Sequence, residues 1–186
     1  MKRNNLNILL VVLLIIMAAG ARIINARLHM PNFAPLAAIS LFSGFIIKDK
    51  RGLAFLVPIF GQLFADLYFQ FFTTIPGFYD FAGQLCNYAG LVAATVLGTR
   101  MVAKPVNALA YTFGASTLFF IISNFGYYLG GWNTYSFAGL IKSYADGIPF
   151  FKYTIAGDMA GGVLLFGSYF LATQAFAKKT QQASIE

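Results

Sequence analysis

Two aspartates lie inside long apolar stretches, and they are the side chains of this chain best suited to chemistry. Asp66 lies in "GQLFADLYFQFF", one helical turn after Gln62, and Asp158 lies in "YTIAGDMAGG". A carboxylate that faces acyl chains costs roughly 2.5 kcal/mol or more, so such a residue normally faces a cavity or a partner. We therefore expect both near one pocket, with Lys152 as a candidate partner. Capping of a helix or of a neighbouring backbone group is the structural alternative, and a proton relay is a third.

The segment "RLHMPNFAP" contains the only histidine of the chain, His29. Pro31 and Pro35 push the residues before them out of helical geometry, which predicts an extended segment at residues 30–32. Asn32 suits the cap of the next helix, and Pro35 suits its first turn. These residues thus have structural explanations, whereas His29 is a candidate for either a ligand contact or an interfacial structural role.

The single cysteine, Cys86, lies in "GQLCNYAG". One cysteine excludes an internal disulfide and a cysteine-cluster metal site. A buried free thiol usually acts as an inert small hydrophobe. As a thiolate it can instead ligate a soft or borderline metal, including the cobalt of a corrinoid.

The only tryptophan, Trp132, follows the glycine pair Gly130–Gly131. Aromatic residues here are explained by an interfacial belt. Alternatively, the segment up to Pro149 forms a lid that hinges at the glycines and covers a planar ligand. Its part "TYSFAGLIKSYADGIP" can also form a short interfacial helix.

The elements that must position these residues are membrane spans. The chain has 186 residues, of which 59% are hydrophobic and 10% charged, whereas about a quarter of a soluble domain is charged. A span needs about 20 apolar residues. We expect an all-α membrane protein of one domain, residues 1–186, with six transmembrane helices at 6–26, 33–47, 53–72, 81–102, 108–129 and 151–175. The second is short, and the first is favoured as a retained span over a cleaved signal peptide.

The basic residues predict the orientation, because cytoplasmic loops carry an excess of Lys and Arg. With both termini cytoplasmic, the inner segments hold Lys2, Arg3, Lys48, Lys50, Arg51, Arg100, Lys104, Lys178 and Lys179, and the outer segments hold Arg22, Arg27, Lys142 and Lys152. The net charge of +7 is thus explained by topology rather than by a nucleic-acid partner. The outer loops are longer and more aromatic, with Tyr79, Tyr88 and Tyr135.

No nucleotide or hydrolase motif accompanies these residues. The sequence contains no P-loop, G-x-S-x-G, H-E-x-x-H or Gly-rich dinucleotide fingerprint. We therefore predict a protein that is not an enzyme and that has no intrinsic cofactor.

Four stretches occur in an order that resembles a bacterial family of small six-span proteins: "RLHMPNFAPLAAISLFSG", "LVPIFGQLFADL", "FFIISNFGYYLGG" and "GIPFFKYTIAGD". The chain is similar to the substrate-binding S-components of energy-coupling-factor vitamin transporters, and to the solitary cobalamin transporters called BtuM. The resemblance implies an S-component-like bundle in the bacterial inner membrane, with an outer pocket built from the first, third and fifth loops. It also implies cobalamin or another corrinoid as the transported ligand, with Cys86 as the cobalt ligand.

The predicted ligand-binding residues combine these arguments. They are His29, Asn32, Asp66, Tyr79, Cys86, Tyr88, Trp132, Tyr135, Lys152 and Asp158. Many S-components dock on an energising module through Ala-x-x-x-Ala in the first helix. Here Ala18, Ala19 and Ala21 lack an alanine four residues later, which favours a solitary transporter or an unusual partner.

Two other functions remain open at this point. One is a transporter of a different small nutrient, in which Cys86 is only structural. The other is a non-transporting scaffold or assembly subunit that binds a protein through the faces of Gly157 and Gly161 or of Gly126 and Gly130, since small residues let helices approach closely. An intramembrane enzyme is a more distant third.

Overall fold

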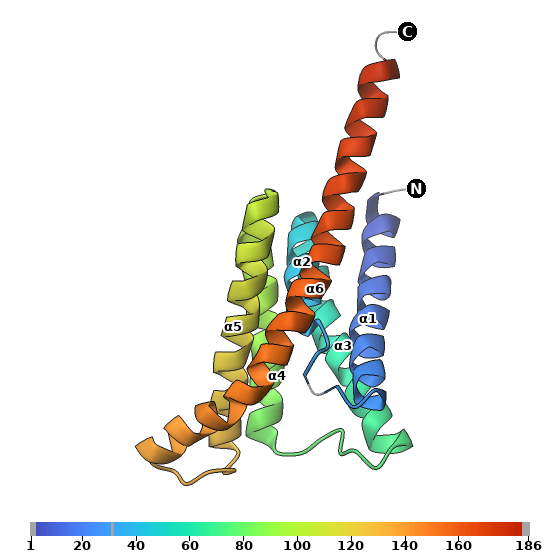
Figure 1. Cartoon of the computed structure of the whole chain (residues 1–186). Coiled ribbons are helices and arrows are strands. Elements are labelled where there is room, and N and C mark those ends of the chain that lie inside the picture. The colour runs from blue at the N-terminus through green and yellow to red at the C-terminus, as the bar shows by residue number, and fades with distance from the viewer. Residues whose placement is uncertain (1–2, 31, 184–186) are drawn as a thin grey trace.

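The computed structural model describes residues 3–30 and 32–183, and this part of the chain is entirely helical outside its connections. The elements are α1 (Arg3–Arg27), α2 (Leu36–Ile46), η1 (Lys48–Lys50), α3 (Arg51–Phe72), α4 (Phe81–Arg100), α5 (Pro105–Leu129) and α6 (Phe137–Ala183). The start of α1 and the end of α6 lie at the same end of the bundle (Figure 1). The predicted all-α class is confirmed, and so is the placement of both ends on one side.

Among the described residues, five helices are long and apolar enough to cross a membrane, namely Asn5–Arg27, Arg51–Phe72, Phe81–Arg100, Pro105–Leu129 and Phe137–Ala177. Their outer surfaces expose large apolar side chains such as Ile16, Phe64 and Leu164. The second of the six expected spans, 33–47, is instead the 11-residue helix α2. At 1.5 Å per residue α2 is about 16 Å long, roughly half the thickness of a bilayer core.

The short helix α2 forms the centre of the core. Every residue from Ala37 to Phe45 is buried. Phe42 and Phe45 pack edge-on against Phe166 of α6, with ring centroids 5.1 and 5.4 Å apart. The same apolar cluster includes Val57 of α3 and residues of the other three helices. Since α2 is enclosed on all sides, its backbone ends must be satisfied by neighbouring parts of the chain.

Two glycines allow α2 and α4 to cross in backbone contact. A Cβ atom on Gly44 would lie 2.1 Å from the carbonyl oxygen of Thr95, and one on Gly98 would lie 2.0 Å from that of Leu41. Only glycine fits at such distances, because a real side chain would overlap the opposing backbone. This crossing fixes the depth of α2 relative to α4.

The last helix corrects the expected boundary at residue 151. α6 begins at Phe137, so most of the predicted lid is helix and only residues 130–136 connect α5 to α6. The hydroxyl of Ser136 accepts a hydrogen bond from the backbone N–H of Gly139 at 3.1 Å, which caps the start of α6. The alternative helix over this segment therefore forms, but it is continuous with the span.

Helix α6 continues through Pro149 because α5 supports it on both sides of the proline. Before the proline, the Tyr144 hydroxyl donates to the carbonyl of Ile121 at 3.0 Å. After it, the ring of Phe151 stacks on Phe120 with centroids 4.2 Å apart. A proline inside a helix removes one backbone hydrogen bond and favours a kink. Contacts with α5 on both flanks hold the helix together across that position.

The α2–α4 crossing gives a direct test of the core. We expect Gly98→Ala to lower the free energy of unfolding by about 1–3 kcal/mol, because the new methyl group forces the two backbones apart. Gly167→Ala is the matched control, since a Cβ at Gly167 meets nothing within 4 Å, and it should raise stability by about 0.5–1 kcal/mol. Thermal unfolding in detergent measures both; equal effects would contradict the crossing.

Candidate ligand-binding site

A cavity of about 820 Å³ lies among α1, α3, α4, α5 and α6 at the end of the bundle away from the chain ends. This volume is in the range of small-molecule sites. The connections after α1, α3 and α5 all contribute to its lining, as His29, Pro76 and Trp132 show. Those are the three loops that the family resemblance implies for a ligand pocket.

The wall made by α1 and α3 is built around an ion pair. The guanidinium of Arg22 binds the fully buried carboxylate of Asp66, and its central carbon Cζ lies 5.3 Å from the centroid of the Phe69 ring. The same nitrogen of Arg22 approaches the backbone oxygen of Gln62 at 3.4 Å. Gln62 and Asp66 share one face of α3, as their spacing predicted. Arg22 lines the cavity, whereas Asp66 lies behind it.

Asp66 also connects α4 to this wall. Its second carboxylate oxygen accepts hydrogen bonds from the amide of Gln84 and from the hydroxyl of Tyr88, the latter at 2.9 Å. The expected partner Lys152 is not involved: it is exposed, and its ammonium lies over the Tyr153 ring at 4.9 Å. Lys152 was a candidate partner for either aspartate, but Asp66 pairs with Arg22 on α1 and Asp158 accepts from Ala38 and Ser116.

Asp158 takes the capping role that was the structural alternative. It accepts hydrogen bonds from the backbone N–H of Ala38 at 3.0 Å and from the hydroxyl of Ser116 at 2.8 Å. The first turn of α2 follows Pro35, which offers no side-chain cap of its own. The carboxylate of α6 thus caps α2 across the bundle, and it also lines the cavity.

His29 lines the cavity from a left-handed backbone conformation, with φ of 52°. The N–H of Met30 bonds the carbonyl of Asn25 at 3.1 Å, and the N–H of His29 bonds that of Ala26 at 3.2 Å. This pair of bonds is a Schellman motif, in which glycine normally occupies the position that His29 takes here. The histidine therefore ends α1 and faces the cavity at the same time.

Asn32 differs from its expected conformation. Its φ of 58° is left-handed rather than extended. It does not cap the next helix either, because α2 begins at Leu36 after Pro35 and Asp158 satisfies its first turn. Asparagine tolerates this backbone region better than most residues. Asn32 nevertheless lines the cavity, as predicted.

Asp80 ties the mouth of the cavity together. It caps α4 by accepting the N–H of Gly83 at 2.5 Å, and it accepts the indole N–H of Trp132 at 2.8 Å. Trp132 stacks on Tyr127 with an interplanar angle of 8° and centroids 5.6 Å apart. These contacts hold the 130–136 connection against the start of α4.

Tyr79 lies beside this mouth and lines the cavity, as predicted. The amide of Asn87 donates a hydrogen bond to its hydroxyl. Desolvation raises the pKa of the Tyr79 phenol above its usual value, while the nearby charge of Arg22 opposes the rise. The phenol therefore stays neutral at physiological pH and keeps its proton for hydrogen bonding.

Five predicted residues do not line the cavity, and Asp66, which lies behind it, is one of them. Lys152 is exposed, Tyr88 binds Asp66 instead, and the hydroxyl of Tyr135 donates to the carbonyl of Leu129 at 3.1 Å. Cys86 lies against α5, where a Cβ on Gly126 would be 3.1 Å from its sulfur. Within the described residues, no three His, Cys, Asp or Glu side chains form a group that could hold a metal ion.

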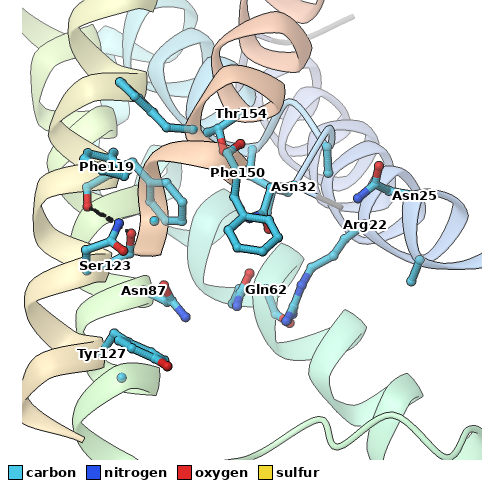
Figure 2. Close-up of a pocket in the computed structure, with 18 of the residues that line it drawn as sticks. Arg22, Asn25, Asn32, Gln62, Asn87, Phe119, Ser123, Tyr127, Phe150 and Thr154 are labelled. Carbon is cyan, nitrogen blue, oxygen red and sulfur yellow. Dashed lines mark hydrogen bonds between the residues drawn. The ribbon is translucent and has the colours of Figure 1, made fainter. Parts of the chain in front are cut away.

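Sequence reasoning missed most of the polar and aromatic lining. Figure 2 shows Arg22 and Asn25 on α1, Gln62 on α3, Asn87 on α4, and Phe119 and Ser123 on α5 around one space. One signal was available, because the spacing of Arg22, Asn25 and His29 places them on one face of a helix. Arg22 was instead counted only as a charge at the end of a span. The lining aromatic residues of α5 could not be separated from lipid-facing ones.

The chain belongs to the DUF6580 family, a family of unknown function, which matches residues 2–182. No curated protein matches the chain, and neither does any solved structure.

The Arg22–Asp66 pair predicts a large loss of stability when one partner is removed. Asp66→Asn should lower the free energy of unfolding by about 3 kcal/mol or more, because it leaves a guanidinium without its counter-charge in a packed wall. Asp146→Asn is the control, since Asp146 pairs with Lys142 on the exposed surface of the same protein, and it should change stability by less than about 1 kcal/mol. Thermal unfolding in detergent compares the two; similar shifts would show that the buried pair is not structural.

The left-handed conformation of His29 gives a second prediction. We expect His29→Gly to be more stable than His29→Ala by about 1 kcal/mol, because only glycine adopts this conformation without a steric cost. Thermal unfolding of the two variants measures the difference directly. If alanine were equally stable, α1 would not end in the Schellman motif described above.

Proposed function

We propose that this DUF6580 protein is an integral membrane protein that binds a small nutrient of the vitamin class and takes part in its uptake. The observation that carries the proposal is the cavity of about 820 Å³ at one end of a bundle of membrane-length apolar helices. A buried polar wall with convergent hydrogen-bonding groups next to aromatic side chains is typical of small-molecule sites. No catalytic step is part of this proposal.

The distribution of charge supports an outward-facing pocket. The connections at the end opposite to the cavity carry Lys48, Lys50, Arg51 and Lys104, and the ammonium of Lys48 donates to the carbonyl of Met101 at 2.6 Å. We infer from the positive-inside rule that this end is cytoplasmic, in the inner membrane of a bacterium. The cavity then opens to the outer side, where a nutrient arrives.

Cobalamin, or another corrinoid, is the substrate that the family resemblance favours. The position of Cys86 against Gly126 does not support its expected role as cobalt ligand. A different small nutrient is therefore the stronger alternative within the same function. We keep a corrinoid as the first ligand to test because its visible absorption gives an immediate answer.

The structure also bears on the partners of the proposed transporter. Ala18 and Ala19 are buried, and a Cβ on Gly61 of α3 would lie 2.6 Å from the Cβ of Ala18. These alanines pack within the protein instead of forming a free docking stripe. This supports a transporter that works alone or with an unusual partner.

The scaffold alternative loses its expected surfaces. Gly157 packs against the carbonyl of Phe33, and Gly161 packs against Pro35. Gly126 and Gly130 pack in the same way against Cys86 and Asp80. Since all four glycines accommodate neighbours inside this chain, they are not free to receive another protein.

Uptake by whole cells tests the proposed function. Cells that express the chain should accumulate one member of a set of labelled vitamins, cobalamin included, at least several-fold faster than cells expressing Thr154→Trp. Thr154 lines the cavity, so the larger side chain should block it. Ala160→Trp is the matched control on the same helix, because Ala160 is exposed and outside the cavity lining, and it should leave uptake intact.

A corrinoid band in the visible spectrum of protein purified from cobalamin-fed cells would identify the substrate. Accumulation of another vitamin without that band would keep the function and change the ligand. If no vitamin accumulates and none binds the purified protein, the proposal is rejected.

A further inference from the structure

The α1–α3 wall of the cavity contains two amide groups with unused hydrogen-bonding capacity. The side-chain oxygens of Asn25 and Gln62 are buried and have no hydrogen-bond partner among the described residues. Gln62 is only 4% exposed, yet it lines the cavity. A buried acceptor without a partner destabilises the folded protein, because it has lost its hydrogen bonds to water. At a cavity wall, such an unpartnered oxygen indicates that a ligand supplies the missing hydrogen bond.

The two amides lie on either side of Arg22 (Figure 2). Arg22 and Asn25 are three residues apart on α1, and the guanidinium of Arg22 contacts the backbone of Gln62. Figure 2 shows Arg22 directed toward Gln62, with Asn87 on the other side of Gln62. The last torsion of a glutamine side chain is broad and roughly two-fold. The Gln62 amide can therefore turn either its N–H₂ or its oxygen toward a ligand.

The charged groups of the cavity are already engaged. Arg22 is paired with Asp66. Asp80 accepts hydrogen bonds from Gly83 and Trp132. Asp158 likewise accepts two, from the backbone of α2 and from Ser116. The polar wall is thus suited to an uncharged group that offers hydrogen bonds rather than to a second ion.

Aromatic rings supply the rest of the surface. The Phe120–Phe151 stack lines the cavity from α5 and α6. The ring of Phe150 points into the same space (Figure 2). Offset stacking between aromatic rings is favourable beyond the burial of apolar area. A flat ring held here would present its edge to the amides on the opposite wall.

We propose that the pocket recognises an uncharged, planar nitrogen heterocycle through a ring edge that carries N–H donors beside carbonyl acceptors, read by the amides of Gln62 and Asn25. A primary amide presents one acceptor and two donors, so it pairs with such an edge through two hydrogen bonds. The inference rests on the proposed function in one respect, since it takes the cavity to be the ligand site. It goes further by naming the chemistry of the ligand's polar edge.

The only tryptophan, Trp132, lines the mouth of the cavity and gives a binding signal in the purified protein. We would titrate the protein in nanodiscs with lumazine, hypoxanthine and uracil, and with N-methylated forms of each. At least one unmethylated compound should quench the Trp132 fluorescence saturably. Its methylated form should bind at least tenfold more weakly, because a methyl group removes the donor.

Two variants locate the recognition. Gln62→Met should weaken binding of the active compound at least tenfold, since the replacement keeps the size and removes the amide. Gln174→Met is the control: Gln174 is exposed on α6 and does not line the cavity, so affinity should be unchanged. Asn25→Leu provides a second test if Gln62→Met does not fold.

Equal binding of the methylated compounds would overturn the inference, and so would affinity that does not depend on Gln62 and Asn25. Absence of binding by all three unmethylated compounds would also reject the heterocycle class. If a vitamin still accumulates in cells in any of these cases, the proposed uptake function stands and only the ligand chemistry is wrong. If no heterocycle binds the purified protein and no vitamin accumulates in cells, the uptake function itself is rejected.

Discussion

The carboxylate of Asp158 on the first turn of α2 is the interaction on which the cavity depends. A helix of 11 residues that is buried on all sides begins within the apolar depth of the bundle. Its first N–H groups need acceptors there, and Pro35 supplies none. Asp158 accepts the N–H of Ala38 at that point and is itself held by the hydroxyl of Ser116. The space between this capped end and the outer surface is where the cavity lies, because α2 does not extend into it.

A second carboxylate, Asp66, holds together the helices of the cavity wall, as Asp158 holds those at its floor. It joins Arg22 on α1 with Gln84 and Tyr88 on α4, so three helices are held at a fixed separation behind the lining. Both aspartates are thus structural in their direct contacts. Their effect on a ligand is to keep the lining groups in position, since Arg22 can face the cavity only while its charge is compensated.

The sequence was sufficient for the helical class and for four of the long apolar helices, α1, α3, α4 and α5, because long apolar runs leave few alternatives in a chain this poor in charge. It failed at α2 and α6. The expected second span, 33–47, was longer than α2, which covers only Leu36–Ile46. For α6, Pro149 suggested a helix boundary, but contacts from Tyr144 and Phe151 to α5 keep the helix continuous there. The error at α6 comes from tertiary contacts that outweigh a local preference, whereas α2 begins directly after Pro35, where the local preference places it.

Within the site, sequence reasoning found residues whose type is unusual inside an apolar chain, such as His29, Asp158 and Trp132, and these do line the cavity. It did not identify residues that stand out only because a buried polar atom lacks a hydrogen-bond partner in the folded protein. Asparagine and glutamine are unremarkable in a sequence, and only the packed structure shows that the oxygens of Asn25 and Gln62 are buried without a donor. In this wall the charged groups are already paired and the amide oxygens are not. Such a wall favours ligands that offer directional hydrogen bonds and carry little charge. Under the ligand proposal above, recognition depends less on the ionised groups of the cavity than on its neutral ones.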